Sequence, residues 1–313
     1  MDKKQTLEHL NNTEEDIYDA LVKDTEELSY YLASDEVAQD IYSKGENEVL
    51  TKVTERQKEP SHVDEALIAA FLLGAGFFTR SLSFLFVFDP FKLDQPSVFS
   101  QYKNNLLNAL NTGQIMTISQ IFQSGRNAGW SVGTLQRNLS IGHFLTESQW
   151  RAVENYRRLL NEQSMEALKR KLRDAGMDSL VLEAFRSGKP LTEAQIDKLV
   201  FNYMQSQVKH RMKLIAETEA TRAFAQAQES VVGQMIAEGV VYEEEVLRFW
   251  VNMRDEKVRA SHKETPYLNK DGRRMGEPFV TPLGPLLYPG DPAGLPQNVT
   301  RCRCVLRYKF DRG

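Results

Sequence analysis

The segment from Gly276 to Asn298 restricts the fold of this chain more than any other, because proline and glycine dominate it. It contains six of the eleven prolines and four glycines. Such a run cannot form a helix or a central strand. Each proline also restricts the unfolded chain, so we expect the segment to follow a rigid, irregular path. It leads into "RCRCVLRYKF", residues 301–310, which is strand-like and holds both cysteines of the chain.

The strand after the proline-rich loop must return to pair with an earlier strand. The nearest candidate is "VLRFWVN", residues 246–252, which is rich in strand formers. A helical turn or short helix is expected at "RDEKVRASHKE", between that strand and the loop. Residues 240–313 therefore predict a small α+β unit, with the two cysteines beneath the loop.

Helical patterns dominate the chain before Gly239. Asn12, three residues before Glu15, is typical of a capping box at the start of an acidic surface helix. Thr146 and Thr192 each precede a glutamine by three residues and predict two further helix starts. We also expect a helix to end at Gly176 and short helices to be separated by glycines. The separating glycines are Gly113, Gly125 and Gly129.

One long helix is predicted from Tyr203 to the stop signal at Gly239. Its apolar stripe runs from Met204 to Met235 at helical spacing, and alanines narrow one face so that another helix can pack closely. The predicted fold is mainly α, with a small C-terminal α+β domain and a long central helix linking the two. The predicted segments are an acidic helical arm (1–60), an apolar helix with an irregular helical region (61–145), a helical body (146–239) and the α+β unit (240–313).

Composition and charge favour a soluble globular protein with different partners at its two ends. The chain is 41% hydrophobic and 26% charged, and its polar, acidic start shows no cleavable signal sequence. Residues 1–60 hold 16 Asp/Glu against 7 Lys/Arg, so the arm carries −9 and the other 253 residues sum to +5. Two cysteines do not make a disulfide framework.

The stretch from Ala66 to Phe88 is the most apolar in the chain. Its first thirteen residues carry no polar side chain, but Arg80 interrupts it. A spanning helix needs about 20 mostly apolar residues, and an arginine in the middle costs about 2.5–3.5 kcal/mol. A buried or oligomer-facing helix is favoured, and membrane contact through 66–88 is the alternative.

Two sets of polar residues are candidates for chemistry. Glu219 and Arg222, beside Thr218, are i,i+3 neighbours on the long helix and can form an ion pair. Asp255, Arg259 and His262 fall at i, i+4 and i+7, so a helix places them on one face. His262 is interpreted as a hydrogen-bonded packing residue rather than a general base, because catalysis needs a partner nucleophile.

Cys302 and Cys304 point to the same side if they lie in a strand. They are then about 6.5–7 Å apart, near the upper limit for a disulfide, so bridging is not expected. With His262 they supply three zinc ligands, whereas zinc prefers four. We favour buried thiols that fill a small core and keep zinc as the alternative.

Taken in order, these residues resemble the phage Mu F-like head morphogenesis family, minor head proteins of tailed bacteriophages. The pattern is a Thr-Glu-x-x-Arg helix, a Trp strand, Asp-x-x-x-Arg-x-x-His, a Pro-Gly-Asp-Pro-type loop and a terminal Cys-Arg-Cys, within residues 203–310. The matching residues are Thr218, Glu219, Arg222, Trp250, Asp255, Arg259, His262, Pro289, Gly290, Asp291, Pro292, Cys302 and Cys304. Two positions depart from it: Glu217 stands where a basic residue is frequent, and Arg301 where asparagine is frequent.

The resemblance implies a low-copy virion protein of the phage head interior, present in the host cytoplasm during assembly. It implies association with the portal protein and other head proteins, an oligomer through the portal ring, and an effect on DNA packaging, retention or ejection. In this interpretation the helical body binds the portal and the C-terminal unit is a rigid adaptor.

The sequence holds no nucleophile–base pair, Gly-rich phosphate loop or paired-carboxylate site, so neither an enzyme nor a cofactor is expected. Three alternatives remain. One is a transferase- or nuclease-like site at Glu219, Arg259 and His262. The second is an ejected internal protein that meets the host membrane through residues 66–88. The third is weak, nonspecific DNA contact, since residues 151–213 hold 13 Lys/Arg against 8 Asp/Glu.

Overall fold

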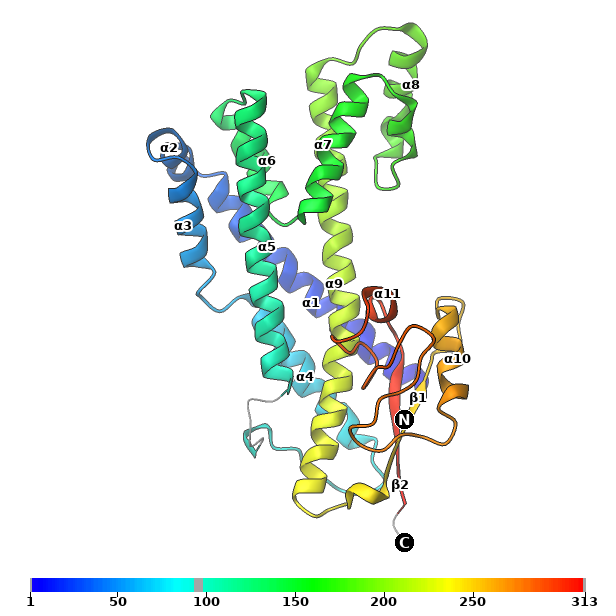
Figure 1. The fold of residues 1–313 in the computed structure, drawn as a ribbon. Helices are drawn as coiled ribbons and strands as arrows, with labels where there is room; N and C mark the ends of the chain where they lie inside the picture. The colour runs from blue at the N-terminus through cyan, green and yellow to red at the C-terminus, as the bar shows by residue number, and fades with distance from the viewer. Residues whose placement is uncertain (1, 93–97, 312–313) are drawn as a thin grey trace. The chain divides into compact units, whose positions relative to one another are not determined.

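The computed structural model describes residues 2–92 and 98–311, and that part of the chain is mainly helical (Figure 1). One two-stranded antiparallel sheet lies near the C-terminus, and the 45-residue helix α9 (Glu193–Ala237) precedes it. The predicted fold class is therefore confirmed. The prolines in residues 88–97 predict a loop there, and residues 93–97 of it lie outside the described residues, as do Met1 and residues 312–313.

The chain forms two compact units, each built from separate segments. Unit 1 comprises residues 1–21, 61–107 and 213–313, and unit 2 comprises residues 22–60 and 108–212. The helices α1 (Lys3–Leu32), α5 (Val98–Ala128) and α9 contribute residues to both units. Of the predicted segments, 240–313 lies wholly in unit 1, whereas the other three contribute to both units.

Unit 2 contains short helices, and three of them begin after a Ser or Thr whose side chain caps the first turn. Besides parts of the three long helices, it holds α2 (Asp35–Ser43), α3 (Glu46–Arg56), α6 (Val132–Gly142), α7 (Glu147–Asn161) and α8 (Asp178–Ser187). The predicted capping box at α7 is confirmed, because Thr146 and Gln149 exchange backbone and side-chain hydrogen bonds at 3.0 and 3.3 Å. Thr192 and Gln195 repeat it at the start of α9.

Two helix predictions in this region are wrong. The segment before Gly176 forms two 3₁₀ turns, Met165–Lys169 and Ala175–Met177, and Gly176 lies inside the second. Helix α5 runs through Gly113 and Gly125 without a break. Gly129, which has a φ of +64°, follows its end. An isolated glycine costs only about 0.5–1 kcal/mol in a helix, and tertiary packing exceeds that cost.

Helix α1 begins at Lys3, so the predicted start at Asn12 is wrong. Asn12 and Glu15 are exposed and lie on the solvent face of a helix that has already begun. The opposite face is buried in unit 1 through Leu10 and Ile17. A polar run in the middle of an amphipathic helix has the same residue types as an N-cap, which explains the error.

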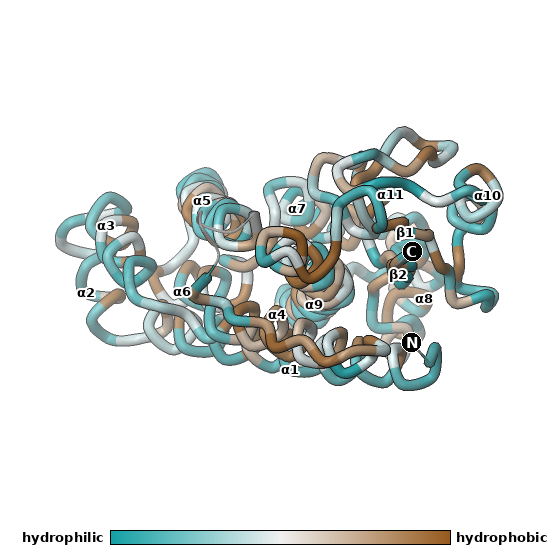
Figure 2. Tube along the Cα trace, turned by 90° about the horizontal axis from the view of Figure 1, so that it is seen from below, coloured by the Kyte–Doolittle hydropathy of each residue, from teal (hydrophilic) through white to brown (hydrophobic). Residues whose placement is uncertain are grey.

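The apolar stretch forms α4 (His62–Arg80) and ends at the Ser81 cap, so it does not continue as a helix to Phe88. Figure 2 shows the run of hydrophobic residues along this helix. Leu67, Phe71 and Phe78 are buried, which confirms the prediction of a buried helix for one face. The helix has the length and composition of a membrane span, although 39% of its most apolar window is buried in the protein.

Small residues bring α4 and α9 close together within unit 1. A Cβ atom added at Gly74 would lie 3.2 Å from the Phe224 side chain and 3.3 Å from the Ala227 Cβ atom. Close helix packing is therefore present at Phe224 and Ala227, beyond the alanines Ala216, Ala220 and Ala223 for which it was predicted. On the other face of α4, Ile68, Leu72 and Leu73 are 40–54% exposed.

After Gly239, the chain forms the sheet and the connections around it. Strand β1 (Val246–Val251) pairs with β2 (Val305–Phe310), with Trp250 opposite Leu306, as predicted. The connection holds α10 (Ala260–Leu268) and α11 (Pro296–Val299). The proline-rich segment has no strand of its own beyond one bridge between Phe279 and Leu286. The expectation that it forms no helix is wrong at its end, because Pro296 is the first residue of α11, where a proline is tolerated.

Candidate functional site

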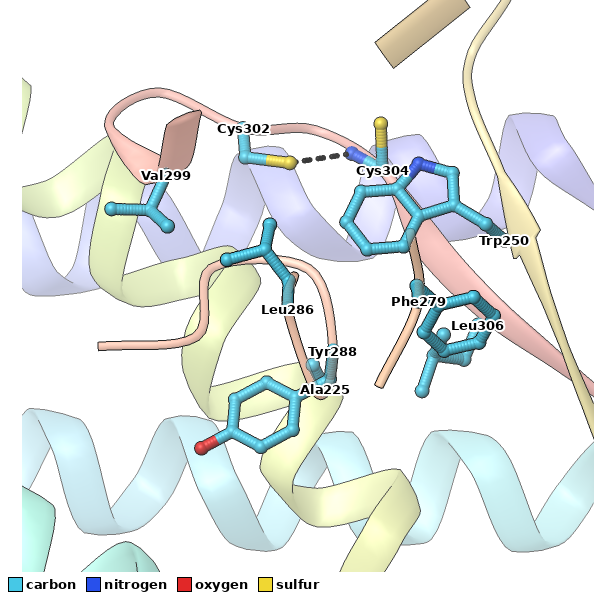
Figure 3. Packing of buried hydrophobic residues seen from close by; sticks show 9 residues of the cluster. All are labelled: Ala225, Trp250, Phe279, Leu286, Tyr288, Val299, Cys302, Cys304 and Leu306. Carbon is cyan, nitrogen blue, oxygen red and sulfur yellow. Dashed lines mark hydrogen bonds between the residues drawn. The ribbon is translucent and has the colours of Figure 1, made fainter. Parts of the chain in front are cut away.

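Most of the sequence motif residues meet around one buried cluster in unit 1, which we call the terminal core. It combines one residue of α9 with residues from both strands, the proline-rich segment and the tail (Figure 3). Its members are Ala225, Trp250, Phe279, Leu286, Tyr288, Val299, Cys302, Cys304 and Leu306. The proline-rich path therefore closes over a real hydrophobic core, and both cysteines lie in it as predicted.

The tail is fastened to α9 by hydrogen bonds from buried side chains. The Arg301 N–H donates to Thr218 Oγ1 at 3.0 Å, and Thr221 Oγ1 donates to the Cys302 main-chain oxygen. Further along, Gln228 Nε2 donates to the Leu306 main-chain oxygen at 3.0 Å. The cysteine segment therefore lies against the Thr218–Arg222 part of the long helix.

Glu219 and Arg222 form a buried ion pair with Tyr102. Arg222 Nη1 lies 2.5 Å from Glu219 Oε1, and the Tyr102 hydroxyl donates to the other carboxylate oxygen. Burial raises the pKa of Glu219, although Arg222 and Tyr102 oppose that shift. Removing one partner of such a pair costs more than the pair contributes, because it leaves a buried charge.

The Pro-Gly-Asp-Pro loop is a tight turn docked on Arg222. Arg222 Nε donates to the Gly290 main-chain oxygen at 2.5 Å. The Asp291 carboxylate accepts from the N–H groups of Leu287 at 2.7 Å and Ala293 at 2.9 Å. Pro289 is buried and Pro292 is exposed on either side of this turn. The loop residues thus serve one purpose, which is to hold an irregular backbone against α9.

The predicted single helical face of Asp255, Arg259 and His262 is wrong. Helix α10 starts at Ala260, and Arg259 is its N-cap residue. Asp255 lies in the preceding turn and pairs with Arg303 at 2.7 Å. Burial raises the pKa of Asp255, but the Arg303 contact outweighs it and holds the pKa below its usual value. The spacing gave a wrong prediction because residues 255–258 form a non-helical turn before α10 begins at Ala260.

Arg259 and His262 each have partners in the tail. The Arg259 guanidinium donates to the main-chain oxygens of Gln297 and Thr300. His262 Nδ1 lies 3.5 Å from Cys302 Sγ and 3.4 Å from Cys304 Sγ. Both cysteines precede β2 rather than lie in it, so their expected separation in a strand does not apply. The three ligand atoms of His262 and the cysteines all lie within 4.8 Å of one another.

Arg248 holds the proline-rich segment in place, and this role was not predicted from the sequence. Its side chain is fully buried and donates to the main-chain oxygens of Arg274, Glu277 and Leu287 at 2.5–3.1 Å. It also pairs with Glu229 on α9 at 3.0 Å. The alternation of strand β1 places it on the inward face with Val246 and Trp250, and this was the available signal.

The two departures from the family pattern contact each other. Arg301 donates through Nε and Nη2 to the carboxylate of Glu217, the second bond at 3.1 Å. Arg301 also has a φ of +55°, which is uncommon for a residue with a side chain. The two charges therefore pair with each other, and the Arg301 N–H also contacts Thr218 Oγ1.

The residues of the alternative catalytic cluster have separate partners. Glu219 bonds to Arg222 and Tyr102, Arg259 to the tail backbone, and His262 to the cysteines and Asn298. An open groove of about 1110 Å³ lies elsewhere in unit 1, beside β1, β2 and α10.

No family model, curated protein or solved structure matches this chain.

Proposed function

We propose that this protein is a minor head protein of a tailed bacteriophage, of the Mu F-like kind, which binds the portal inside the head. The observation that carries the proposal is the joining of motif residues far apart in the sequence. Thr218 and Arg222 on α9 hold Arg301 and Gly290, which belong to the tail and the Pro-Gly-Asp-Pro loop. Residues chosen by the resemblance therefore share one structural purpose.

The geometry supports a structural role in preference to an active site. The polar motif residues bond to main-chain oxygens, form buried ion pairs or contact the cysteine cluster. Such contacts make a stiff module from segments that lack regular secondary structure. A stiff module is suited to serve as an adaptor, because binding then costs little ordering entropy.

The direct test is to ask whether the protein is part of the particle. Mass spectrometry of purified phage heads is expected to find the chain at low copy. The full-length protein is expected to capture the portal protein in a pull-down, and heads assembled without portal are expected to lack it. Absence of the chain from purified particles contradicts the proposal. Substrate turnover that His262→Ala abolishes, with folding intact, contradicts it too and favours the enzyme.

Weak DNA contact is a second proposal, supported by the charge of the groove beside the sheet. Five basic side chains line it against two acidic ones. The basic residues are Lys3, Arg254, Lys263, Lys270 and Arg307. Contacts with several phosphates make affinity fall steeply between about 50 and 200 mM salt. Double-stranded DNA binding measured over that range is expected to weaken in the Lys263→Glu/Arg307→Glu variant. Binding that does not change with salt contradicts this proposal.

A further inference from the structure

The hydrogen bonds around Asn298 fix which nitrogen of His262 carries its proton. The Thr281 hydroxyl donates to the Gly284 main-chain oxygen at 2.6 Å, so it accepts from Asn298 Nδ2 at 2.9 Å. The other end of the amide, Oδ1, therefore faces His262 Nε2 at 3.0 Å. An amide oxygen only accepts, so Nε2 is the N–H donor. In neutral His262, the Nδ1 lone pair then points away from Asn298.

That lone pair faces two sulfur atoms at once. Cys302 Sγ and Cys304 Sγ lie 3.5 and 3.4 Å from Nδ1. One lone pair accepts one thiol hydrogen, so the two thiols cannot both donate to it. The three residues are 1–2% exposed, so bulk solvent does not reach the second thiol. A single cation between the three atoms satisfies all of them.

The distances and the charge match zinc. Zinc–sulfur bonds of about 2.3 Å and zinc–nitrogen bonds of about 2.0–2.1 Å at a tetrahedral angle place nitrogen and sulfur about 3.6 Å apart. Two thiolates neutralise the charge of Zn²⁺ in this buried position, and their protons leave to solvent on binding. The Asn298 contact is the outer hydrogen bond that a metal-binding histidine ordinarily makes.

One further contact lies at the sulfur atom of Cys302. The Cys304 N–H also donates to Cys302 Sγ at 3.4 Å, as the dashed line in Figure 3 shows. Trp250 Nε1 is buried and lies on the Cys304 side in that view.

We propose that His262, Cys302 and Cys304 bind one zinc ion, with water in the fourth position. The ion joins α10 to the tail and adds a cross-link under the proline-rich segment. The inference is drawn from the geometry of these residues and is independent of the head-protein proposal.

The test uses the full chain purified under reducing conditions without chelators. Elemental analysis is expected to find about one zinc per chain. After removal of zinc, Co²⁺ is expected to give a thiolate-to-cobalt charge-transfer band in the near ultraviolet. Cys302→Ser and Cys304→Ser are each expected to lose about half of that absorbance. Asn298→Ala is expected to weaken zinc affinity about 10–100-fold and to leave the cobalt band in place.

His210 is exposed on α9, so His210→Gln is the matched control for His262→Gln and is expected to bind zinc as the wild type does. If the serine variants do not fold, the wild-type chain still decides the question. Chelation is then expected to lower its melting temperature, and zinc but not magnesium to restore it. A folded wild-type chain that holds no zinc and gives no cobalt–thiolate band overturns the proposal.

Discussion

Arg222 and Gly290 are 68 residues apart in the sequence, and Arg222 Nε donates to the Gly290 main-chain oxygen at 2.5 Å. The same guanidinium pairs with Glu219 at 2.5 Å and lies over the Tyr102 ring at 4.6 Å. One side chain therefore joins α9, α5 and the Pro-Gly-Asp-Pro loop within unit 1. This explains why an arginine, with donors in a fixed fork, occupies the position.

Arg222→Met is expected to lower the free energy of unfolding by about 3–5 kcal/mol, because Glu219 is left buried without its cation. Glu219→Gln in the same chain is expected to recover part of that loss. Urea unfolding of the wild type, both single variants and the double variant measures the coupling. A single variant as stable as the wild type would show that the pair is solvated in solution.

Gly290→Ala is expected to destabilise the protein by about 1–2 kcal/mol, because Gly290 has a φ of +81° and a side chain is strained there. The added Cβ atom would also lie 3.4 Å from the Arg222 backbone. The matched control is Gly233→Ala on α9, where nothing lies within 4 Å of the new atom. That variant is expected to gain about 0.5–1 kcal/mol. Thermal unfolding of both variants checks the opposite signs.

Arg248→Lys is expected to loosen the proline-rich segment. A lysine cannot reach the three main-chain oxygens that Arg248 bonds, and buried oxygens left unpaired cost about 1–3 kcal/mol. Limited proteolysis is expected to cut within residues 276–298 faster than in the wild type. Arg307→Lys on the exposed face of β2 serves as the control and is expected to change neither the free energy of unfolding nor the cleavage rate. Equal cleavage rates in both variants would assign the stiffness to the prolines alone.

His143 in unit 2 is expected to make stability fall at acidic pH. Burial, partly opposed by backbone hydrogen bonds and assisted by Arg211, lowers the pKa of His143 to about 4 from its ordinary 6.5. The unfolded chain therefore takes up the proton first as the pH falls. Stability is full above about pH 6.5 and declines down to about pH 4, by up to about 3 kcal/mol.

The measurement for His143 is urea unfolding of the wild type and of His143→Gln between pH 7 and pH 4. Carboxylates titrate in both chains, so the difference between the two curves isolates the histidine. The wild type is expected to lose more stability over this range than the variant. Parallel curves would show that His143 has the same pKa in the folded and the unfolded chain.

The sequence was informative where local chemistry decides the structure. Thr146 and Gln149 are close in the chain, so their capping box needed no tertiary information. The pairing of β1 with β2 followed from strand-forming residues on both sides of a segment that excludes regular structure. Cys302 and Cys304 were placed correctly in a small core, because free cysteines are among the most buried residues. The strand geometry that argued against a disulfide does not apply, since both residues precede β2.

The remaining features depend on contacts between distant residues. Tyr102 meets Glu219, and Asn298 meets His262, and neither pairing has a local signal. The start of α10 at Ala260 depends on Asp255 leaving the helix to pair with Arg303. Arg248 is an exception, because side chains alternate between the two faces of β1 and this alternation predicts an inward position for it.

The composition of unit 1 has a consequence for biosynthesis. Residues 1–21 share a hydrophobic cluster with α9 and β2, through Leu10, Phe224 and Val305. At about 5–20 residues per second, the ribosome needs roughly 10–40 s to go from the first of these segments to residue 213. During that interval, Leu10 has neither Phe224 nor Val305 beside it, and Phe77 of α4 is the member of this cluster that has already been synthesised. Unit 2 ends at residue 212 and can therefore fold before unit 1. The amino-terminal segment stays accessible to chaperones until the later residues of unit 1 have been synthesised.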